Sequence, residues 1–237
     1  MLLVRVKVAR NKMYGKTEAI VNVKRWQAMF IEILSAGVYG YVGFCLGRRK
    51  DKVKYEIHIG EQLVNRAIKM HLPYSNYHLL KNVTLPTTQE GMTTQIDHVL
   101  ICEYGIFVIE TKHYAGVVAG KKDAKQWVQF TAWDKRKFQN PLRQNYKHVK
   151  ELEFLFPEIN AKDIHSLVVF SGEARFRNAM PDNVMHANHI AMHIKQFNKK
   201  VLSNSDMELV IGRIQLVRKE ESIETDRQHI LNLNKRF

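Results

Sequence analysis

Beyond residue 55, apolar and polar residues alternate in some segments with the spacing of a helix and in others with the spacing of a strand, as in a folded α/β protein. Residues 59–72 repeat apolar side chains at helical spacing, and Pro73 ends the predicted helix. Its apolar positions are Leu63, Val64, Ala67, Ile68 and Leu72. The β-rich runs 95–102 and 106–112 are separated by a short turn that contains Gly105, and this pattern predicts a β-hairpin.

The middle of the chain predicts more strands and a second helix. The further strands are expected at 79–85, 116–119, 126–131 and 165–171. Asn140 and Pro141 provide an N-cap and a proline at the first helical position, so a helix should run from there to about Phe156. Together these elements predict a mixed central β-sheet flanked by helices, in a domain over residues 56–171.

Residues 172–237 are expected to form a C-terminal α/β extension that packs on this domain. Within it, 187–203 and 224–235 have the pattern of helices. The apolar run 211–217 predicts a strand between them.

Two segments precede the domain. Residues 1–25 form a basic arm, and residues 26–47 are predicted to form an apolar helix. The stretch 28–46 has 19 residues with one charge, Glu32, and a membrane span needs roughly 20 apolar residues. Because Glu32 is costly in hydrocarbon and basic residues flank both ends, two interpretations stay open: a single transmembrane anchor, or a buried or interfacial helix.

The charge balance narrows the classes of partner. The chain has 37 Lys and Arg against 23 Asp and Glu, a formal charge of +14, which suits nucleic acid or anionic lipid unless it serves solubility alone. Cys45 and Cys102 form no C-x-x-C motif, which disfavours a disulfide scaffold and a structural zinc site and suits a reducing compartment. His186, His189 and His193 have no acidic or cysteine neighbour and are expected to be a polar surface feature.

Residues with chemical potential gather at one end of the predicted hairpin. Since side chains alternate faces along a strand, Glu110 and Lys112 should share one face and Thr111 the other. Closing the turn places Asp97 across from Glu110 or Thr111, and either register leaves it near Glu110. Two adjacent carboxylates repel each other unless a cation lies between them, and Mg²⁺ prefers such oxygen ligands. The alternative is an ordinary cross-strand salt bridge.

Glu61 is a third candidate carboxylate. It lies on the same helical face as Val64 and Ile68, which should pack on the sheet. A carboxylate on that face is costly to bury unless it is paired or binds a metal. The alternative is an acid in the first turn that complements the helix dipole.

Several short motifs occur in a fixed order along the chain. They are Gly60-Glu61, Gln95 to Leu100, Gly105 to Lys112, Gly116, Trp127, and Asn140 to Asn145. Their order and spacing over roughly residues 56–171 resemble the nuclease-related domain, or NERD, family, which is similar to the PD-(D/E)XK nucleases. Ile96 stands where that superfamily's name has proline, a position with no ligand role.

The resemblance implies a restriction-endonuclease-like core with a specific site. In it, Glu61, Asp97 and Glu110 bind Mg²⁺ or Mn²⁺, and Lys112 assists catalysis. Gln144 would contact the substrate or order the site.

Other residues carry weaker signals. His98 and His113 flank the predicted site and are expected either to contact phosphate or to be plain strand residues. Trp127 and Trp133 should either stack on bases or pack in the core. A basic stretch beyond the hairpin would form either a phosphate-binding rim or a solvated face. Its members are Lys121, Lys122, Lys125, Lys135, Arg136 and Lys137.

The residues and the resemblance together predict a Mg²⁺-dependent nuclease that hydrolyses phosphodiester bonds, with DNA as the expected substrate. Two alternatives remain open at this point. One is a non-catalytic nucleic-acid-binding module with the same fold, and the other is a membrane-tethered interaction protein whose basic face meets anionic lipid. The expected location is the cytoplasm, with residues 26–47 as a candidate anchor to the inner face of the cell membrane.

Overall fold

The computed structural model describes residues 59–73, 77–220, 222 and 225. The predicted basic arm at 1–25 and the predicted apolar helix at 26–47 lie outside these residues, as does nearly all of 224–235. No helix within the described ranges combines the length and the apolar character needed to cross a membrane.

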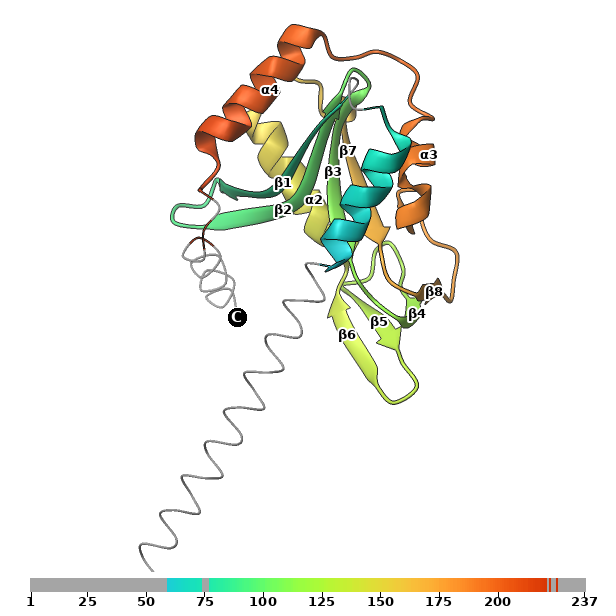
Figure 1. Ribbon diagram of the computed structural model, residues 1–237. Helices are drawn as coiled ribbons and strands as arrows, with labels where there is room; N and C mark the ends of the chain where they lie inside the picture. Colours follow the sequence, from blue (N-terminus) through green and yellow to red (C-terminus); the bar gives the residue numbers. More distant parts are fainter. Residues whose placement is uncertain (1–58, 74–76, 221, 223–224, 226–237) are drawn as a thin grey trace, which may run out of the picture. The chain divides into compact units, whose positions relative to one another are not determined.

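A five-stranded mixed sheet forms the centre of the described domain, in the order β1-β2-β3-β7-β9 (Figure 1). Its strands are β1 (Tyr77–Pro86), β2 (Thr93–Cys102), β3 (Gly105–Lys112), β7 (Ile164–Phe170) and β9 (Val184–His186). β1, β2 and β3 pair antiparallel, whereas β7 runs parallel to β3 and β9 runs parallel to β7. The predictions of a mixed central sheet and of the β2–β3 hairpin are therefore confirmed.

Helices cover both faces of this sheet (Figure 1). On one face, α2 (Pro141–Leu155) and α4 (Asn204–Val217) enclose a core with side chains from β1, β2 and β3. On the other face, the helix over 59–71 and the short α3 (Ile190–Ile194) enclose a second core. Val64 and Ile68, which were expected to face the sheet, are fully buried there. The result is three layers, with a sheet between two layers of helix.

The start of α2 follows from its capping residue. The side-chain oxygen of Asn140 accepts a hydrogen bond from the Leu142 N–H at 3.0 Å, and Pro141 occupies the first helical position. The Asn140 amide nitrogen also donates to carbonyls in the 121–124 loop, at 2.7 Å for Ala124 O. The cap therefore fixes both the beginning of α2 and the loop that precedes β5, and the predicted helix start is confirmed.

A second, four-stranded sheet has the order β6-β5-β4-β8. Its strands are β4 (Gly116–Ala119), β5 (Gln126–Phe130), β6 (Lys135–Gln139) and β8 (Ala174–Phe176). It continues from the central sheet, because β3 leads into β4 and β7 leads into β8. β3 pairs parallel with β7 in the central sheet, and β4 pairs parallel with β8 in the second sheet. One of its faces packs Trp127 and Phe138 against Phe170, with the Trp127 and Phe170 rings stacked at 6.4 Å between centroids.

Beyond residue 186 the secondary structure differs from the sequence-based expectation. The predicted strand over 211–217 is the second half of α4, whose N-terminus has a capping box between Ser203 and Asp206. Only Val210 and Ile214 of α4 are fully buried, so the apolar run is a helical stripe rather than a strand. The prediction of a strand was wrong because the capping box between Ser203 and Asp206 starts a helix that continues through this run.

The predicted helix over 187–203 is also shorter than expected. A 3-10 turn at Ala187–His189 leads into α3, and the regular structure then stops. The N–H groups of Val201 and Leu202 instead donate to the Glu103 carbonyl in the β2–β3 turn, at 2.8 and 3.1 Å. This tertiary contact replaces the helical hydrogen bonds that the sequence pattern predicted.

Candidate active site

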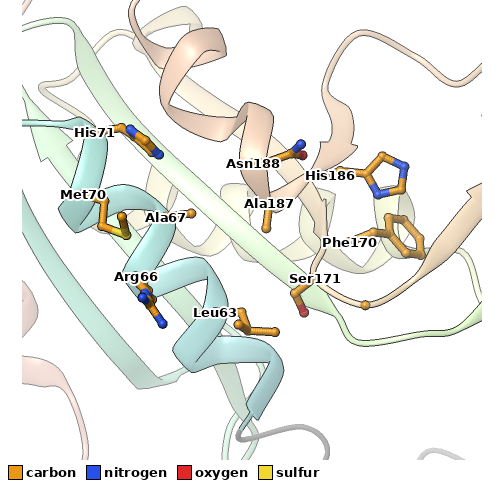
Figure 2. Close-up of a pocket in the computed structure, with 11 residues that line it drawn as sticks. Leu63, Arg66, Ala67, Met70, His71, Phe170, Ser171, His186, Ala187 and Asn188 are labelled. Carbon is orange, nitrogen blue, oxygen red and sulfur yellow. The ribbon is translucent and has the colours of Figure 1, made fainter.

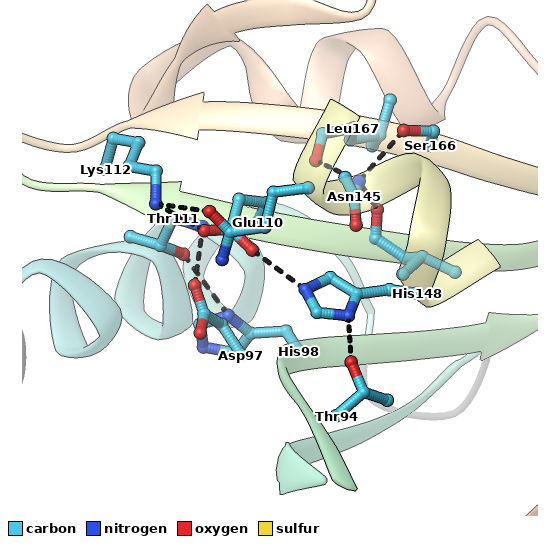
Figure 3. Close-up of polar contacts among 12 residues, drawn as sticks. Thr94, Asp97, His98, Glu110, Thr111, Lys112, Asn145, His148, Ser166 and Leu167 are labelled. Carbon is cyan, nitrogen blue, oxygen red and sulfur yellow. Dashed lines mark hydrogen bonds and ion pairs between the residues drawn. The ribbon is translucent and has the colours of Figure 1, made fainter. Parts of the chain in front are cut away.

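The candidate site lies where β2 and β3 separate. The last residue pair of their ladder is His98 with Ile109, so Asp97 follows on the side of Glu110. Beyond that pair the Asp97 carboxylate takes the place of a backbone acceptor, because Thr111 N–H donates to Asp97 Oδ2 at 2.7 Å (Figure 3). The register is one of the two considered from the sequence, and it leaves Asp97 and Glu110 as neighbours.

Asp97 is electrostatically crowded. Burial raises the pKa of its carboxyl well above the ordinary value, and the Glu110 carboxylate raises it further. Lys112 and the Thr111 N–H act in the opposite direction but do not cancel these effects. The site therefore disfavours a second negative charge at Asp97, as expected for two carboxylates without a cation between them.

Glu110 and Lys112 form a close ion pair on the face that α2 covers. Lys112 Nζ lies 2.6 Å from Glu110 Oε1, and the side chains are 18% and 2% exposed, respectively. Burial alone would raise the pKa of Glu110, but Lys112 and His148 more than offset it and lower that pKa. Burial would likewise lower the pKa of Lys112, yet Glu110 raises it. Both groups are thus held in their charged forms.

Gln144 joins this pair from α2. Its Oε1 accepts a hydrogen bond from Lys112 Nζ at 3.1 Å. An ammonium group has three N–H donors, and Glu110 and Gln144 account for two of them. The structure therefore brings together Asp97, Glu110, Lys112 and Gln144, four of the five residues expected at the site.

His148 is a site residue that the sequence reasoning missed. It is buried on α2, with Nε2 3.3 Å from Glu110 Oε2 and Nδ1 2.7 Å from the Thr94 hydroxyl (Figure 3). Thr94 thus orients the imidazole toward the second oxygen of Glu110. The signal was its spacing, since His148 lies four positions after Gln144 on a helix and shares its face.

Asn145 fixes α2 above the sheet. Its amide nitrogen, buried in the interior, lies 2.8 Å from Val108 O, 2.9 Å from Leu167 O and 2.9 Å from Ser166 Oγ. One side chain therefore ties α2 to the two central parallel strands, β3 and β7. Gln144 and His148 stand on either side of Asn145 in the sequence, so this attachment also sets their positions over Glu110.

The first turn of the 59–71 helix comes close to the site on the other face of the sheet. A Cβ added at Gly60 would lie 2.6 Å from His113 Cβ and 2.9 Å from Ser171 Oγ, so only glycine allows this approach. The Glu61 carboxylate contributes to the raised pKa of Asp97, although it is the smallest of the named causes. Glu61 is therefore close enough for its charge to act on Asp97.

The two histidines beside the site have structural contacts. His98 is buried, and burial together with Lys81 lowers its pKa to about 4, so the ring is neutral at pH 7. Its Nδ1 is 3.5 Å from Thr111 Oγ1. His113 Nδ1 is 3.2 Å from Ser171 Oγ. His98 is thus a strand residue of β2, as one of the two expectations had it, whereas His113 lies directly after the end of β3.

The two tryptophans differ in their surroundings. Trp127 is fully buried and its indole N–H donates to Lys121 O at 3.0 Å, which confirms the core-packing alternative. Trp133 lies in the turn between β5 and β6 and is 97% exposed. The predicted basic stretch divides between the loop before β5 and strand β6, and all six side chains are exposed.

A separate hollow of about 480 Å³ lies between the 59–71 helix and the 3-10 turn Ala187–His189 that precedes α3 (Figure 2). It reaches the C-terminal end of β7 at Ser171, and its polar lining includes Arg66, His71 and His186. None of the five expected site residues lines it. His186 also stacks on Phe176, with ring centroids 4.6 Å apart.

Asp97 and Glu110 have the properties of ligands for a divalent cation. Within the described ranges no three His, Cys, Asp or Glu side chains are already grouped around a metal position. However, Glu110 Oε2 is a buried carboxylate oxygen that accepts no hydrogen bond from the described residues. His148 Nε2 lies 3.3 Å away, a distance that allows an ion pair. A cation would satisfy that oxygen and relieve the repulsion at Asp97, so the donor set fits Mg²⁺.

Comparison with known proteins identifies the family of this domain. The family model of the nuclease-related domain matches residues 58–171, which include every residue of the candidate site. An uncharacterized protein of Bacillus anthracis is 32% identical over 196 residues, covering 80% of this chain and 89% of that protein. No solved structure matches the chain. The matched domain and this relative show that the chain belongs to the nuclease-related domain family.

Proposed function

We propose that this protein is a Mg²⁺-dependent nuclease with a restriction-endonuclease-like site that hydrolyses phosphodiester bonds, with DNA as its substrate. The observation that carries the proposal is the convergence of Asp97, Glu110 and Lys112 at the point where β2 and β3 separate. A purely structural ion pair would not need a second carboxylate whose charge the site disfavours. The domain family suggests a nuclease-related function on independent grounds.

The side chains divide the work of such a site. Asp97 and Glu110, joined by Glu61, would hold the cation. Bound Mg²⁺ would stabilise charge on the phosphoryl group and activate a water molecule. Lys112 is kept protonated by Glu110, and its third N–H is available to a phosphate oxygen or to the attacking water.

Residues on α2 and β2 keep these groups in position. Gln144 holds the Lys112 ammonium by a hydrogen bond of 3.1 Å. Thr94 and His148 orient the second oxygen of Glu110. Such outer contacts fix the direction of a ligand's lone pairs and commonly change metal affinity or activity by 10- to 100-fold when removed.

The test is cleavage of end-labelled DNA and RNA, single- and double-stranded, by the full chain. We expect cleavage with Mg²⁺, none with a chelator, and recovery when Mg²⁺ is restored. Asp97→Asn should abolish cleavage, whereas the matched control Asp182→Asn changes an exposed acid outside the site and should keep it. If the wild type binds these nucleic acids but cuts none of them, the protein is a non-catalytic binding module and the proposal is wrong.

A further inference from the structure

The second sheet has one face that no described element covers. Its inward face carries Trp127, Phe138 and Val118, which pack in the core. By strand alternation and the observed register, the outward face has a half-buried apolar centre with basic side chains on both sides. The apolar centre is Val117, Ala119, Val128 and Phe130, and the basic residues on its sides are Lys135, Lys137, Arg175 and Arg177. We call these eight residues the outer face.

The charge of the outer face is of one sign. None of the four strands β4, β5, β6 and β8 contains an acidic residue. Residues 59–220 hold 22 Lys and Arg against 16 Asp and Glu, a net charge of +6. Segments 113–139 and 173–180, which build the second sheet, hold eight basic and three acidic residues, so they supply +5 of that total. The positive charge of the described domain is therefore concentrated on this sheet.

An aromatic ring lies in the middle of that charge. Phe130 pairs with Val117 on β4 and with Lys135 on β6. The Lys135 ammonium and the Arg177 guanidinium each lie 5.6 Å from the centre of the Phe130 ring. Both cations are on exposed side chains, so they can move to a phosphate while the ring stays in place. Trp133, in the adjoining turn, adds a fully exposed aromatic side chain.

From this geometry we infer that the outer face binds single-stranded nucleic acid, with phosphates on the lysines and arginines and an unpaired base stacked on Phe130. A basic sheet with an aromatic ring at its centre is suited to this ligand, because every unpaired base offers a flat face for stacking. A duplex keeps its bases stacked inside and would reach only the charges. The acidic headgroups of a membrane would likewise leave the ring without a specific role.

The outer face also lies within reach of the candidate active site. Val117, the partner of Phe130, is five residues after Lys112, which limits the distance between their Cα atoms to about 17 Å. A bound strand could therefore extend from the outer face to the carboxylates within a few nucleotides. The inference names the substrate form of the proposed nuclease and, in that respect only, rests on the proposed function.

The experiment measures binding separately from cleavage. Fluorescence anisotropy of a labelled 15-nucleotide single strand and of the matching duplex is recorded with the full chain in chelator, so that no cutting occurs. We expect tighter binding of the single strand, and a loss of about five- to one-hundred-fold for both Phe130→Ala and Phe130→Leu. Phe130→Trp should keep the affinity because it keeps a ring. Thermal melting of each variant shows whether the fold is intact, and Phe130→Leu retains most of the apolar volume.

Salt dependence tests the charged part of the outer face. Lys137→Gln and Arg175→Gln should each reduce the slope of log affinity against log salt by about 0.7 for a single strand, whereas Phe130→Leu should leave the slope unchanged. The matched control Lys162→Gln removes an exposed charge outside the second sheet and should change neither slope nor affinity.

The outcomes separate this inference from the proposed nuclease activity. Equal affinity of wild type and Phe130→Leu for the single strand would overturn the inference, and so would tighter binding to phosphatidylserine vesicles than to the single strand. Binding that depends on Phe130, without any cleavage after Mg²⁺ is added, would support the outer face and refute the nuclease. Cleavage of single strands at the same rate and KM by wild type and Phe130→Leu would support the nuclease and refute the outer face.

Discussion

Replacing Asn145 should weaken the attachment of α2 to the sheet and with it the whole domain. The Asn145 amide nitrogen lies within hydrogen-bond distance of three acceptors but carries only two hydrogens. One of these hydrogens is therefore shared between two acceptors. Each such bond contributes about 0.5–1.5 kcal/mol net, and a buried acceptor left unsatisfied costs about 1–3 kcal/mol. We therefore expect Asn145→Ala to lower the free energy of unfolding by about 2–4 kcal/mol.

A second substitution at the same position tests the donor role itself. Asn145→Asp keeps the shape of the side chain but turns its donors into acceptors that face the carbonyls of Val108 and Leu167. The buried introduced carboxyl would have its pKa raised above the unfolded value of about 3.9. Its folded state therefore binds the proton more tightly, and stability should fall as pH rises above about 4. At pH 7 we expect Asn145→Asp to be less stable than Asn145→Ala.

The assay is urea unfolding followed by circular dichroism at pH 4 and pH 7. In thermal melts, each kcal/mol should correspond to about 2–4 °C for a chain of this size. Lys147→Ala is the matched control, because Lys147 is exposed on the same helix and should stay within about 0.5 kcal/mol of wild type. The reasoning would be refuted if Asn145→Ala matched this control, or if the two Asn145 variants were equally stable at pH 7.

Three further substitutions and one fractionation test other parts of the structure. The folded state raises the pKa of Asp97, so ionisation of this carboxyl lowers the stability of the fold as the pH rises through that pKa. Asp97→Asn should therefore melt at a higher temperature than wild type at pH 7. An unchanged melting temperature would contradict this. Lys112→Gln should reduce any Mg²⁺-dependent cleavage rate by about 10²–10³, while rates within threefold of wild type would exclude its role. Gly60→Ala, which would place a Cβ 2.6 Å from His113 Cβ, should destabilise the domain by about 1–3 kcal/mol, as measured by urea unfolding. If residues 26–47 anchor the chain, a salt wash of cell membranes should not release it, whereas release would indicate peripheral attachment.

The sequence was most informative where the alternation of apolar and polar residues predicted both a strand and the strand that pairs with it. In the β2–β3 hairpin, alternation alone placed Glu110 with Lys112, and the turn at Gly105 left two registers, both of which keep Asp97 close. The motif order added Gln144, whose bond to Lys112 the structure then shows. Local patterns of this kind need no knowledge of the rest of the fold.

Contacts that depend on the tertiary arrangement were out of reach. His148 could not be assigned to Glu110 until α2 was known to lie over β3, although its helical spacing from Gln144 was a usable signal. The strands β8 and β9 have only three residues each, too few for a period to be recognised. After α3, the N–H groups of Val201 and Leu202 donate to the Glu103 carbonyl in a distant turn, a contact that no local pattern predicts.

The uneven charge of the described domain should also affect how fast it meets a polyanion. Outside the second sheet, residues 59–220 hold 14 basic and 13 acidic side chains and are almost neutral, so the domain resembles an electric dipole with the sheet at its positive end. Such a dipole turns the protein in the field of an approaching polyanion, and the sheet then arrives first. The advantage lies in the association rate and declines with ionic strength, because at physiological salt the field extends only about 8 Å. A modest net charge, placed at one end, thus favours productive encounters over random ones.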